Sequence, residues 1–265
     1  WGTAVFIGFL TALSSTALVL KILQEKGEVT SNYGHTVVGI LIFQDIILIP
    51  MLLLTPMLGG QTADIGERLL VMGTKTLFMV GLVYVANRWI MPRVLHLLAL
   101  TKNQELFLMS ILLVCLAVAL LTSELGMSLA FGAFLGGLMI SRSEYSEDAF
   151  SHLIPFRDTF TSFFFVSIGM LLDLNFLVHN FILVIVTVLV VIAIKTFVAG
   201  GTAFALGHTF RGTMMVGFAL AQIGEFSFIL AKTGQEYNLL SEYYYQLFLA
   251  VTIVSMAVSP FLVMG

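Results

Sequence analysis

The stretch Thr11-Ala12-Leu13-Ser14-Ser15-Thr16 places a polar cluster in the middle of an apolar segment that extends over about residues 2–23. A second apolar segment contains a similar cluster, Ala221-Gln222-Ile223-Gly224-Glu225-Phe226-Ser227. Small hydroxyl residues inside a membrane helix can simply hold helices together. Two interrupted spans that run in opposite directions, however, are typical of inverted repeats whose broken helices surround an ion site in mid-membrane.

The composition of the chain independently predicts a membrane protein. Of 265 residues, 59% are hydrophobic and only 10% are charged, which is too little charge to cover the surface of a water-soluble fold. The single cysteine, Cys115, excludes an intramolecular disulfide and a cysteine-based metal site. The net charge of −3 and the lack of a basic cluster argue against nucleic-acid partners, and nothing in the sequence calls for a cofactor.

The apolar segments predict an all-α, polytopic membrane protein with nine spans. A hydrocarbon core of about 30 Å requires roughly 20 helical residues, and charged or turn residues mark the ends of each segment. The predicted spans are approximately 2–23, 35–58, 67–89, 105–123, 127–141, 158–174, 177–207, 212–232 and 243–264. Residues 88–102 suit an amphipathic helix at the interface, and residues 143–154 suit a loop or a second surface helix.

The distribution of lysine and arginine predicts the orientation of these spans. Eight basic residues fall at one side and two at the other, so the first side is expected to be cytoplasmic, with the N-terminus outside and the C-terminus inside. The first group is Lys21, Lys26, Arg88, Arg93, Lys102, Arg142, Arg157 and Arg211, and the second is Arg68 and Lys232. The first segment has no early positive residue, so it is expected to be a true span rather than a signal peptide.

Asp45 is the strongest candidate for an ion-binding residue. No other charged residue occurs from Val29 to Ala63, which places the carboxyl group near mid-membrane, where an ionisable group usually marks a transport pathway. Gln44 adds an amide beside it, and Pro50 can free a backbone carbonyl five residues later. A permanently protonated or purely structural acid is the alternative. We expect Asp45 to bind a proton and a cation in turn.

Three more charged residues lie well inside predicted spans, away from the span ends. Lys195 is expected to be the counter-charge of Asp45, although a lysine at that depth can also be structural. Lys75 is expected to extend toward the outer interface. Glu225 can line the ion site or cap a broken half-helix, and the second role is preferred; Gln222 and Ser227 accompany it in the crossing-helix cluster.

Five motifs, in order along nearly the whole chain, resemble the Kef-type branch of the monovalent cation:proton antiporter superfamily. They are Ala12-Leu13-Ser14-Ser15-Thr16-Ala17, Leu41-Ile42-Phe43-Gln44-Asp45-Ile46, Gly132-Ala133-Phe134-Leu135-Gly136-Gly137, Phe164-Phe165-Val166-Ser167-Ile168-Gly169-Met170 and Leu220-Ala221-Gln222-Ile223-Gly224-Glu225-Phe226-Ser227-Phe228. The resemblance implies a core of inverted repeats with crossed broken helices, which moves against a dimerisation domain.

The resemblance also implies a division of residues 1–265. Core parts are expected at about 1–58 and 177–265, with a linker and dimerisation side at about 67–174. It implies a homodimer, with Asp45 as the carrier of proton and cation and with Gln44 favouring K⁺ over Na⁺. Spans that precede the first one in the family, and the cytosolic regulatory domain of Kef proteins, are expected to be missing from these 265 residues.

These expectations together predict a secondary antiporter that exchanges K⁺, or alternatively Na⁺, for H⁺ across a cell or inner membrane. Oxygens of Gln44, Thr11, Ser14, Ser15 and Thr16 are candidate cation ligands, since hard cations prefer oxygen. A ligand-gated K⁺ channel or efflux pathway without proton coupling is the alternative. An intramembrane enzyme is disfavoured, because the sequence has no buried Ser/His pair and no HExxH motif.

Overall fold

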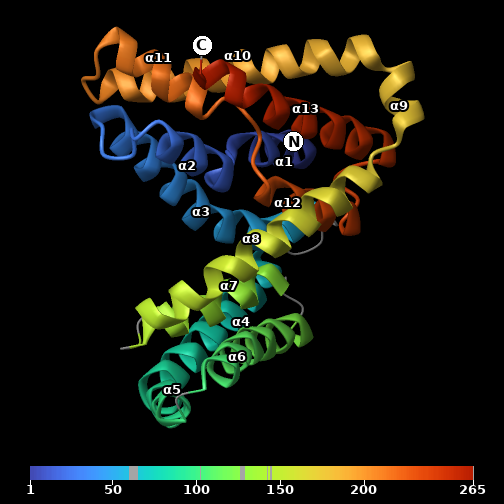
Figure 1. Cartoon of the computed structure of the whole chain (residues 1–265). Helices are drawn as coiled ribbons and strands as arrows, with labels where there is room; N and C mark the ends of the chain where they lie inside the picture. Colours follow the sequence, from blue (N-terminus) through green and yellow to red (C-terminus); the bar gives the residue numbers. More distant parts are fainter. Residues whose placement is uncertain (60–64, 102, 126–128, 142, 144, 265) are drawn as a thin grey trace. The chain divides into compact units, whose positions relative to one another are not determined.

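The fold is known from a computed structural model that describes residues 1–59, 65–101, 103–125, 129–141, 143 and 145–264 (Figure 1). All regular secondary structure in these ranges is helical, which confirms the all-α prediction. Lys102 and Arg142, which contribute to the predicted orientation, lie outside the described residues. The chain divides into two units, one of residues 1–60 and 168–265 and the other of residues 61–167.

The first unit contains the two interrupted spans and the helices packed around them. Its helices are α1 (Gly2–Ala12), α2 (Thr16–Glu25), α3 (Asn32–Leu58), α9 (Leu174–His179), α10 (Phe181–Ala205), α11 (Phe210–Ala219), α12 (Phe226–Glu236) and α13 (Glu242–Met264), together with the last residues of α8. Helices α10 and α11 pack closely because Gly217 of α11 leaves room for the backbone of Thr196. Close approach at small residues is the usual way in which membrane helices associate.

The second unit differs from the sequence prediction in two places. It contains α4 (Ile65–Val85), a π-helical turn η1 (Ala86–Ile90), α5 (Met91–Leu100), α6 (Gln104–Glu124), α7 (Leu129–Ser141) and most of α8 (Ser146–Leu171). No break separates α4, η1 and α5, so the predicted interfacial helix at 88–102 is the end of a longer helical run that accommodates a π-bulge. Residues 146–154 are helical, which excludes the loop alternative, but they begin α8 rather than forming a separate helix; Glu147 and Asp148 favour the helix start.

Five helical segments among the described residues are long and apolar enough to cross a membrane. They are Gly2–Glu25, Asn32–Leu58, Gln104–Glu124, Phe181–Ala205 and Glu242–Val263, and Leu129–Ser141 is a shorter apolar helix. The predicted span at 212–232 is interrupted, as its polar cluster predicts: two helices, α11 and α12, of 10 and 11 residues lie on either side of an unwound linker. The chain is therefore an integral membrane protein, while the count of nine spans stays a prediction.

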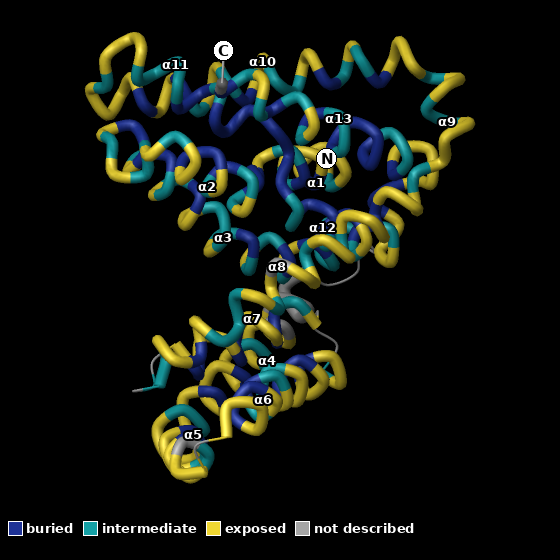
Figure 2. The backbone as a smooth tube through the Cα atoms, viewed as in Figure 1, coloured by how far each residue is buried: buried dark blue, intermediate teal, exposed yellow. Residues whose placement is uncertain are grey.

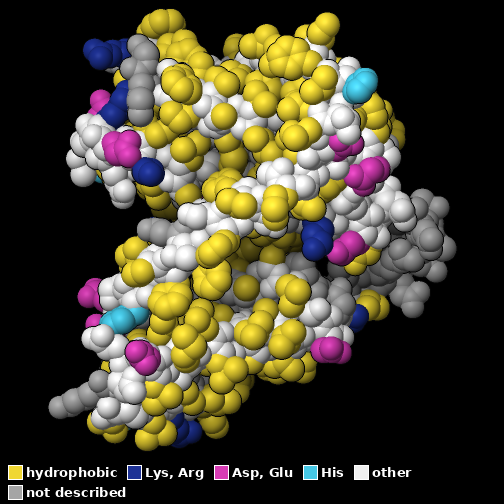
Figure 3. Space-filling model, turned by 45° about the vertical axis from the view of Figure 1, so that its right-hand side comes forward, with side chains coloured by type: hydrophobic (Ala, Val, Ile, Leu, Met, Phe, Trp, Pro, Cys, Tyr) yellow, Lys and Arg dark blue, Asp and Glu magenta, His cyan; other side chains and the backbone are white. Residues whose placement is uncertain are grey.

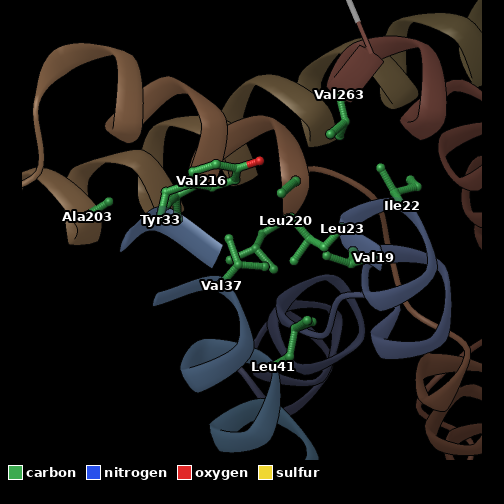
Figure 4. Close-up of a cluster of buried hydrophobic side chains, with 11 residues drawn as sticks. Val19, Ile22, Leu23, Tyr33, Val37, Leu41, Ala203, Val216, Leu220 and Val263 are labelled. Carbon is green, nitrogen blue, oxygen red and sulfur yellow. The ribbon is translucent and has the colours of Figure 1, made fainter. Parts of the chain in front are cut away.

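Burial separates the helices that surround the interruptions from those that present apolar side chains outward (Figure 2). A cluster of eleven buried residues joins α2, α3 and α11 with single contributions from α10 and α13 (Figure 4). It consists of Val19, Ile22, Leu23, Tyr33, Val37, Leu41, Ala203, Val216, Ala219, Leu220 and Val263. By contrast, Ile182 and Phe197 of α10 are 79% and 82% exposed.

Apolar side chains also cover much of the molecular face shown in Figure 3. In water such a surface would be costly, whereas lipid chains solvate it without penalty.

Candidate ion site at two unwound crossing helices

The first interrupted span unwinds at Leu13, Ser14 and Ser15. Leu13 and Ser15 have extended backbone, with φ/ψ of −75°/142° and −76°/107°. The Ser15 hydroxyl accepts a hydrogen bond from the Leu18 N–H at 3.3 Å and so caps the start of α2. The unwinding leaves the last carbonyls of α1 and the first N–H groups of α2 without partners inside their own helices.

The second interrupted span unwinds between Ala219 and Phe226. Leu220 ends α11, and α12 resumes at Phe226 with Glu225 as its N-cap. Helix α13 holds this linker from one side: the Ile223 N–H donates to the Ser255 hydroxyl at 3.3 Å, and the Ser259 hydroxyl donates to Gln222 Oε1 at 3.1 Å. The side chains that make these bonds are fully buried: Ser255, Ser259 and Gln222.

The two unwound linkers cross each other in direct contact, and Figure 1 shows the α11–α12 linker passing the α1–α2 linker. The Gly224 N–H donates to the Leu13 carbonyl at 3.0 Å, and the Ser14 hydroxyl donates to the Leu220 carbonyl at 3.0 Å. A β-carbon at Gly224 would lie 2.5 Å from the Ser14 carbonyl carbon and oxygen. Glycine is therefore required at this position by the close approach of the two backbones.

Gln44 ties α3 to the first linker through both ends of its amide. Its Oε1 accepts from the Ser14 N–H at 2.8 Å, and its Nε2 donates to the Ala12 carbonyl at 3.0 Å. The amide thereby satisfies one donor and one acceptor that the unwinding exposes. This arrangement makes Gln44 part of the framework that fixes α3 against the crossing.

The next residue, Asp45, places its carboxylate at the start of α2. The Thr16 hydroxyl lies 3.1 Å from both Asp45 Oδ1 and Asp45 Oδ2, so it donates to the carboxylate as a shared, bifurcated bond. The N-terminus of a helix carries a partial positive charge that stabilises an anion. Asp45 and the α2 terminus thus form a negatively charged site, in which the carboxylate oxygens keep lone pairs that the Thr16 hydroxyl does not use.

Lys195 of α10 lies at the opposite helix end, the C-terminus of α1. Its ammonium donates to the carbonyls of Thr11, Ala12 and Leu13 at 2.7, 3.1 and 2.9 Å, and the residue is 9% exposed. An ammonium has three N–H donors, and these carbonyls use all three. The positive charge also offsets the partial negative charge of the helix C-terminus. A counter-charge role toward Asp45 stays a prediction, now through the broken helix rather than through a direct bond.

Glu225 reaches the same end of α2 as Asp45. Its Oε1 accepts from the Ala17 N–H at 3.4 Å, while its Oε2 is buried and has no hydrogen-bond partner among the described residues. Ala17 follows Thr16 directly, so two carboxylates are held by two successive residues at one helix start.

Two of the predicted site residues make no side-chain hydrogen bond to the crossing. The Thr11 hydroxyl donates within α1, to the carbonyls of Ile7 and Gly8, so that Thr11 contributes to the crossing through its backbone carbonyl. The Ser227 side chain is fully buried, and its hydroxyl has no partner in the part of the chain that the structure describes. Sequence reasoning missed Ser255 and Ser259. Ser255 follows Thr252 by three residues, and Ser259 follows Ser255 by four, so the three hydroxyls share one face of the otherwise apolar α13. This spacing is the signal that could have identified them.

Two crossed and broken helices, with acids at one half-helix start and a lysine at the other half-helix end, are typical of ion-transporting membrane proteins. The family described as sodium/hydrogen exchanger, transmembrane, matches residues 1–264, and the chain belongs to this family. The resemblance to Kef-type cation:proton antiporters found in the sequence is thereby confirmed.

Three relatives are named as cation antiporters. The chain is 34% identical over 263 residues to K(+) efflux antiporter 4 of Arabidopsis thaliana, and this match covers 97% of this chain and 44% of the relative. It is 34% identical over 261 residues to the putative K(+) efflux antiporter KefB of Alkalimonas amylolytica, covering 98% and 40%, respectively. It is 33% identical over 268 residues to the putative cation/proton antiporter YbaL of Escherichia coli (strain K12), covering 98% and 48%. The chain thus spans less than half the length of these relatives.

The contact between the linkers predicts the effect of Gly224→Ala. The added methyl group must push the Ser14 backbone away, and overpacking of this kind costs about 1–3 kcal/mol. We expect Gly224→Ala to lower the thermal stability of the purified protein and to impair transport, whereas Gly201→Ala, where a β-carbon meets no atom within 4 Å, should leave both unchanged. Equal behaviour of the two variants in heat-challenge chromatography and in transport would contradict the close crossing.

The contacts of Lys195 predict the effect of Lys195→Met. This variant removes one donor from each of three carbonyls. The Ala12 and Leu13 carbonyls keep the bonds from Gln44 Nε2 and the Gly224 N–H, whereas the Thr11 carbonyl loses the donor of its 2.7 Å bond. A buried group that stays unpaired costs about 1–3 kcal/mol, so the melting temperature should fall. Lys232→Met, at an exposed lysine of α12, is the matched control and should leave the melting temperature unchanged.

The double variant Lys195→Met/Asp45→Asn separates the two roles of Lys195. If Lys195 caps α1, the two substitutions should change stability additively. Mutual compensation in the double variant would instead support direct pairing of Lys195 with Asp45.

Proposed function

We propose that the chain forms the ion-translocating part of a secondary antiporter, which exchanges a monovalent cation for H⁺ through Asp45. The observation that carries this proposal is the Asp45 carboxylate at the start of α2, beside the crossing of two unwound segments. An acid within a membrane span is costly, so it usually marks a functional site. Here it retains free lone pairs for a proton or a cation.

The exchange follows from competition for the same carboxylate oxygens. A cation bound to Asp45 excludes the proton, and a proton on Asp45 removes the charge that attracts the cation. The Thr16 hydroxyl holds the carboxylate in place in both cases, because it donates to the ionised group and can accept from the protonated one. The Thr16 hydroxyl oxygen, and the lone pair that the Ser15 hydroxyl oxygen keeps beside its bond from the Leu18 N–H, are the further cation ligands that we propose from the first linker.

The framework residues explain why these ligands stay in place while ions exchange. Gln44 and the Ser14 hydroxyl are bound to backbone groups of the linkers, so we assign them to holding the crossing rather than to the cation itself. K⁺ is the favoured cation, and Na⁺ is the second choice. Support for K⁺ comes from the names of the relatives from Arabidopsis thaliana and Alkalimonas amylolytica, both K(+) efflux antiporters.

The resemblance to the family extends the proposal to the whole protein. We propose that residues 1–58 and 177–265 belong to the moving core and that residues 67–174 provide the linker and the dimerisation side of a homodimer. The lysine and arginine distribution supports an N-terminus outside and a cytoplasmic C-terminus in a cell or inner membrane. Since the relatives are about twice as long as this chain, further spans and a cytosolic regulatory domain are proposed for the full-length protein.

Asp45→Asn tests the function directly. The amide keeps the size of the side chain but cannot carry the charge that the exchange requires. In proteoliposomes that contain the full-length protein, we expect cation-driven proton movement to fall to the level of protein-free liposomes. Asp148→Asn, at an exposed acid in the first turn of α8, should transport at the unchanged rate.

Two outcomes would contradict this account. Normal proton movement by Asp45→Asn would remove Asp45 from the mechanism. Cation currents from the unaltered protein that persist without any proton gradient or proton movement would favour the channel alternative over an antiporter.

A further inference from the structure

The start of α2 holds two acids, of which the mechanism above uses one. Thr16 donates its hydroxyl to Asp45, and Ala17 donates its N–H to Glu225. The two carboxylates come from α3 and from the second linker, elements that are 180 residues apart in the sequence at positions 45 and 225. The crossing of the linkers is what brings them to one helix end.

The charges at the crossing do not balance when both acids are ionised. Lys195 supplies one positive charge at the C-terminus of α1, and the N-terminus of α2 adds only about half a charge. Two carboxylates therefore leave an excess of negative charge in a low-dielectric environment, which one monovalent cation can neutralise. With Asp45 alone, the lysine would already balance the site.

The free oxygen atoms agree with this charge count. Both ends of the Gln44 amide bind backbone groups, and the Ser14 hydroxyl donates to Leu220, so these side chains are already engaged. Glu225 Oε2, by contrast, is buried and has no partner among the residues described. Buried polar atoms are normally satisfied, so an unpaired carboxylate oxygen beside an ion site calls for a ligand.

We propose that Glu225 is the second carboxylate ligand of the transported cation, which binds between Asp45 and Glu225 at the start of α2. This inference rests on the proposed function and adds a residue to the same site. Glu225 then supplies the second acidic group of the site from the opposite linker, while the neutral Gln44 beside Asp45 holds the framework. The cation also joins the two linkers, so its binding is coupled to their crossing.

The competing role of Glu225 is to cap α2 and nothing more. Glu225→Gln separates the two roles, because the glutamine Oε1 can still accept from the Ala17 N–H while the charge is lost. Glu236→Gln is the matched control: it removes an exposed acid from the same helix, α12.

The experiment measures K⁺ binding to the purified full-length protein by calorimetry and the K⁺ dependence of proton movement in proteoliposomes. For Glu225→Gln we expect the K⁺ dissociation constant and the half-saturating K⁺ concentration to rise about tenfold or more, tenfold being about 1.4 kcal/mol of binding free energy. Glu236→Gln should match the unaltered protein. Unchanged K⁺ binding by a folded Glu225→Gln variant overturns the proposal and leaves the capping role.

A second measurement on the unaltered protein keeps the proposal testable if Glu225→Gln does not fold. Carbodiimide modification of Glu225, followed by mass spectrometry, should be slower in K⁺ than in choline, because the bound cation covers the carboxylate. Equal rates in the two salts would overturn the proposal.

Asp45→Asn distinguishes failure of this inference from failure of the proposed function. If Asp45→Asn abolishes exchange but Glu225→Gln binds K⁺ normally, only the role of Glu225 is wrong. If Asp45→Asn exchanges normally, the function itself is wrong.

Discussion

The hydrogen bond from the Gly224 N–H to the Leu13 carbonyl is the contact on which the rest of the site depends. An unwound backbone inside a membrane must find partners within the protein, because lipid offers none. Here each linker supplies partners for the other, and Gln44 and Ser255 supply more from α3 and α13. The crossing is thus stabilised by the same backbone groups that the unwinding exposes.

The crossing also explains where the charges lie. Breaking a helix creates a C-terminus with partial negative charge and an N-terminus with partial positive charge inside the protein. Lys195 binds the first, and Asp45 and Glu225 lie at the second. The partial charge of a helix start stabilises a carboxylate but does not neutralise it, so the carboxylate can still bind a cation. The fold therefore produces the site directly from the two interruptions.

Much of this arrangement could be predicted from residue types. The polar clusters at 11–16 and 221–227 predict the interrupted helices, and the isolated Asp45 predicts the acid beside them. The partners could not be predicted, because a hydrogen bond such as Ser14 to Leu220 joins residues 206 positions apart. Lys195 illustrates what the sequence does not reveal. Its place inside a long apolar segment is evident from the sequence, but its three carbonyl partners depend on the path of the unwound backbone. Likewise, the continuous run from α4 to α5 could not be inferred from charges that suggested an interface.

The most direct test of the central claim is to locate the transported cation in the full-length protein. Tl⁺ replaces K⁺ in many proteins and scatters anomalously, so diffraction from crystals soaked in Tl⁺ would show its position. The account predicts an anomalous peak in contact with the Asp45 carboxylate at the start of α2. A strong peak elsewhere in the membrane region, with none at Asp45, would contradict it.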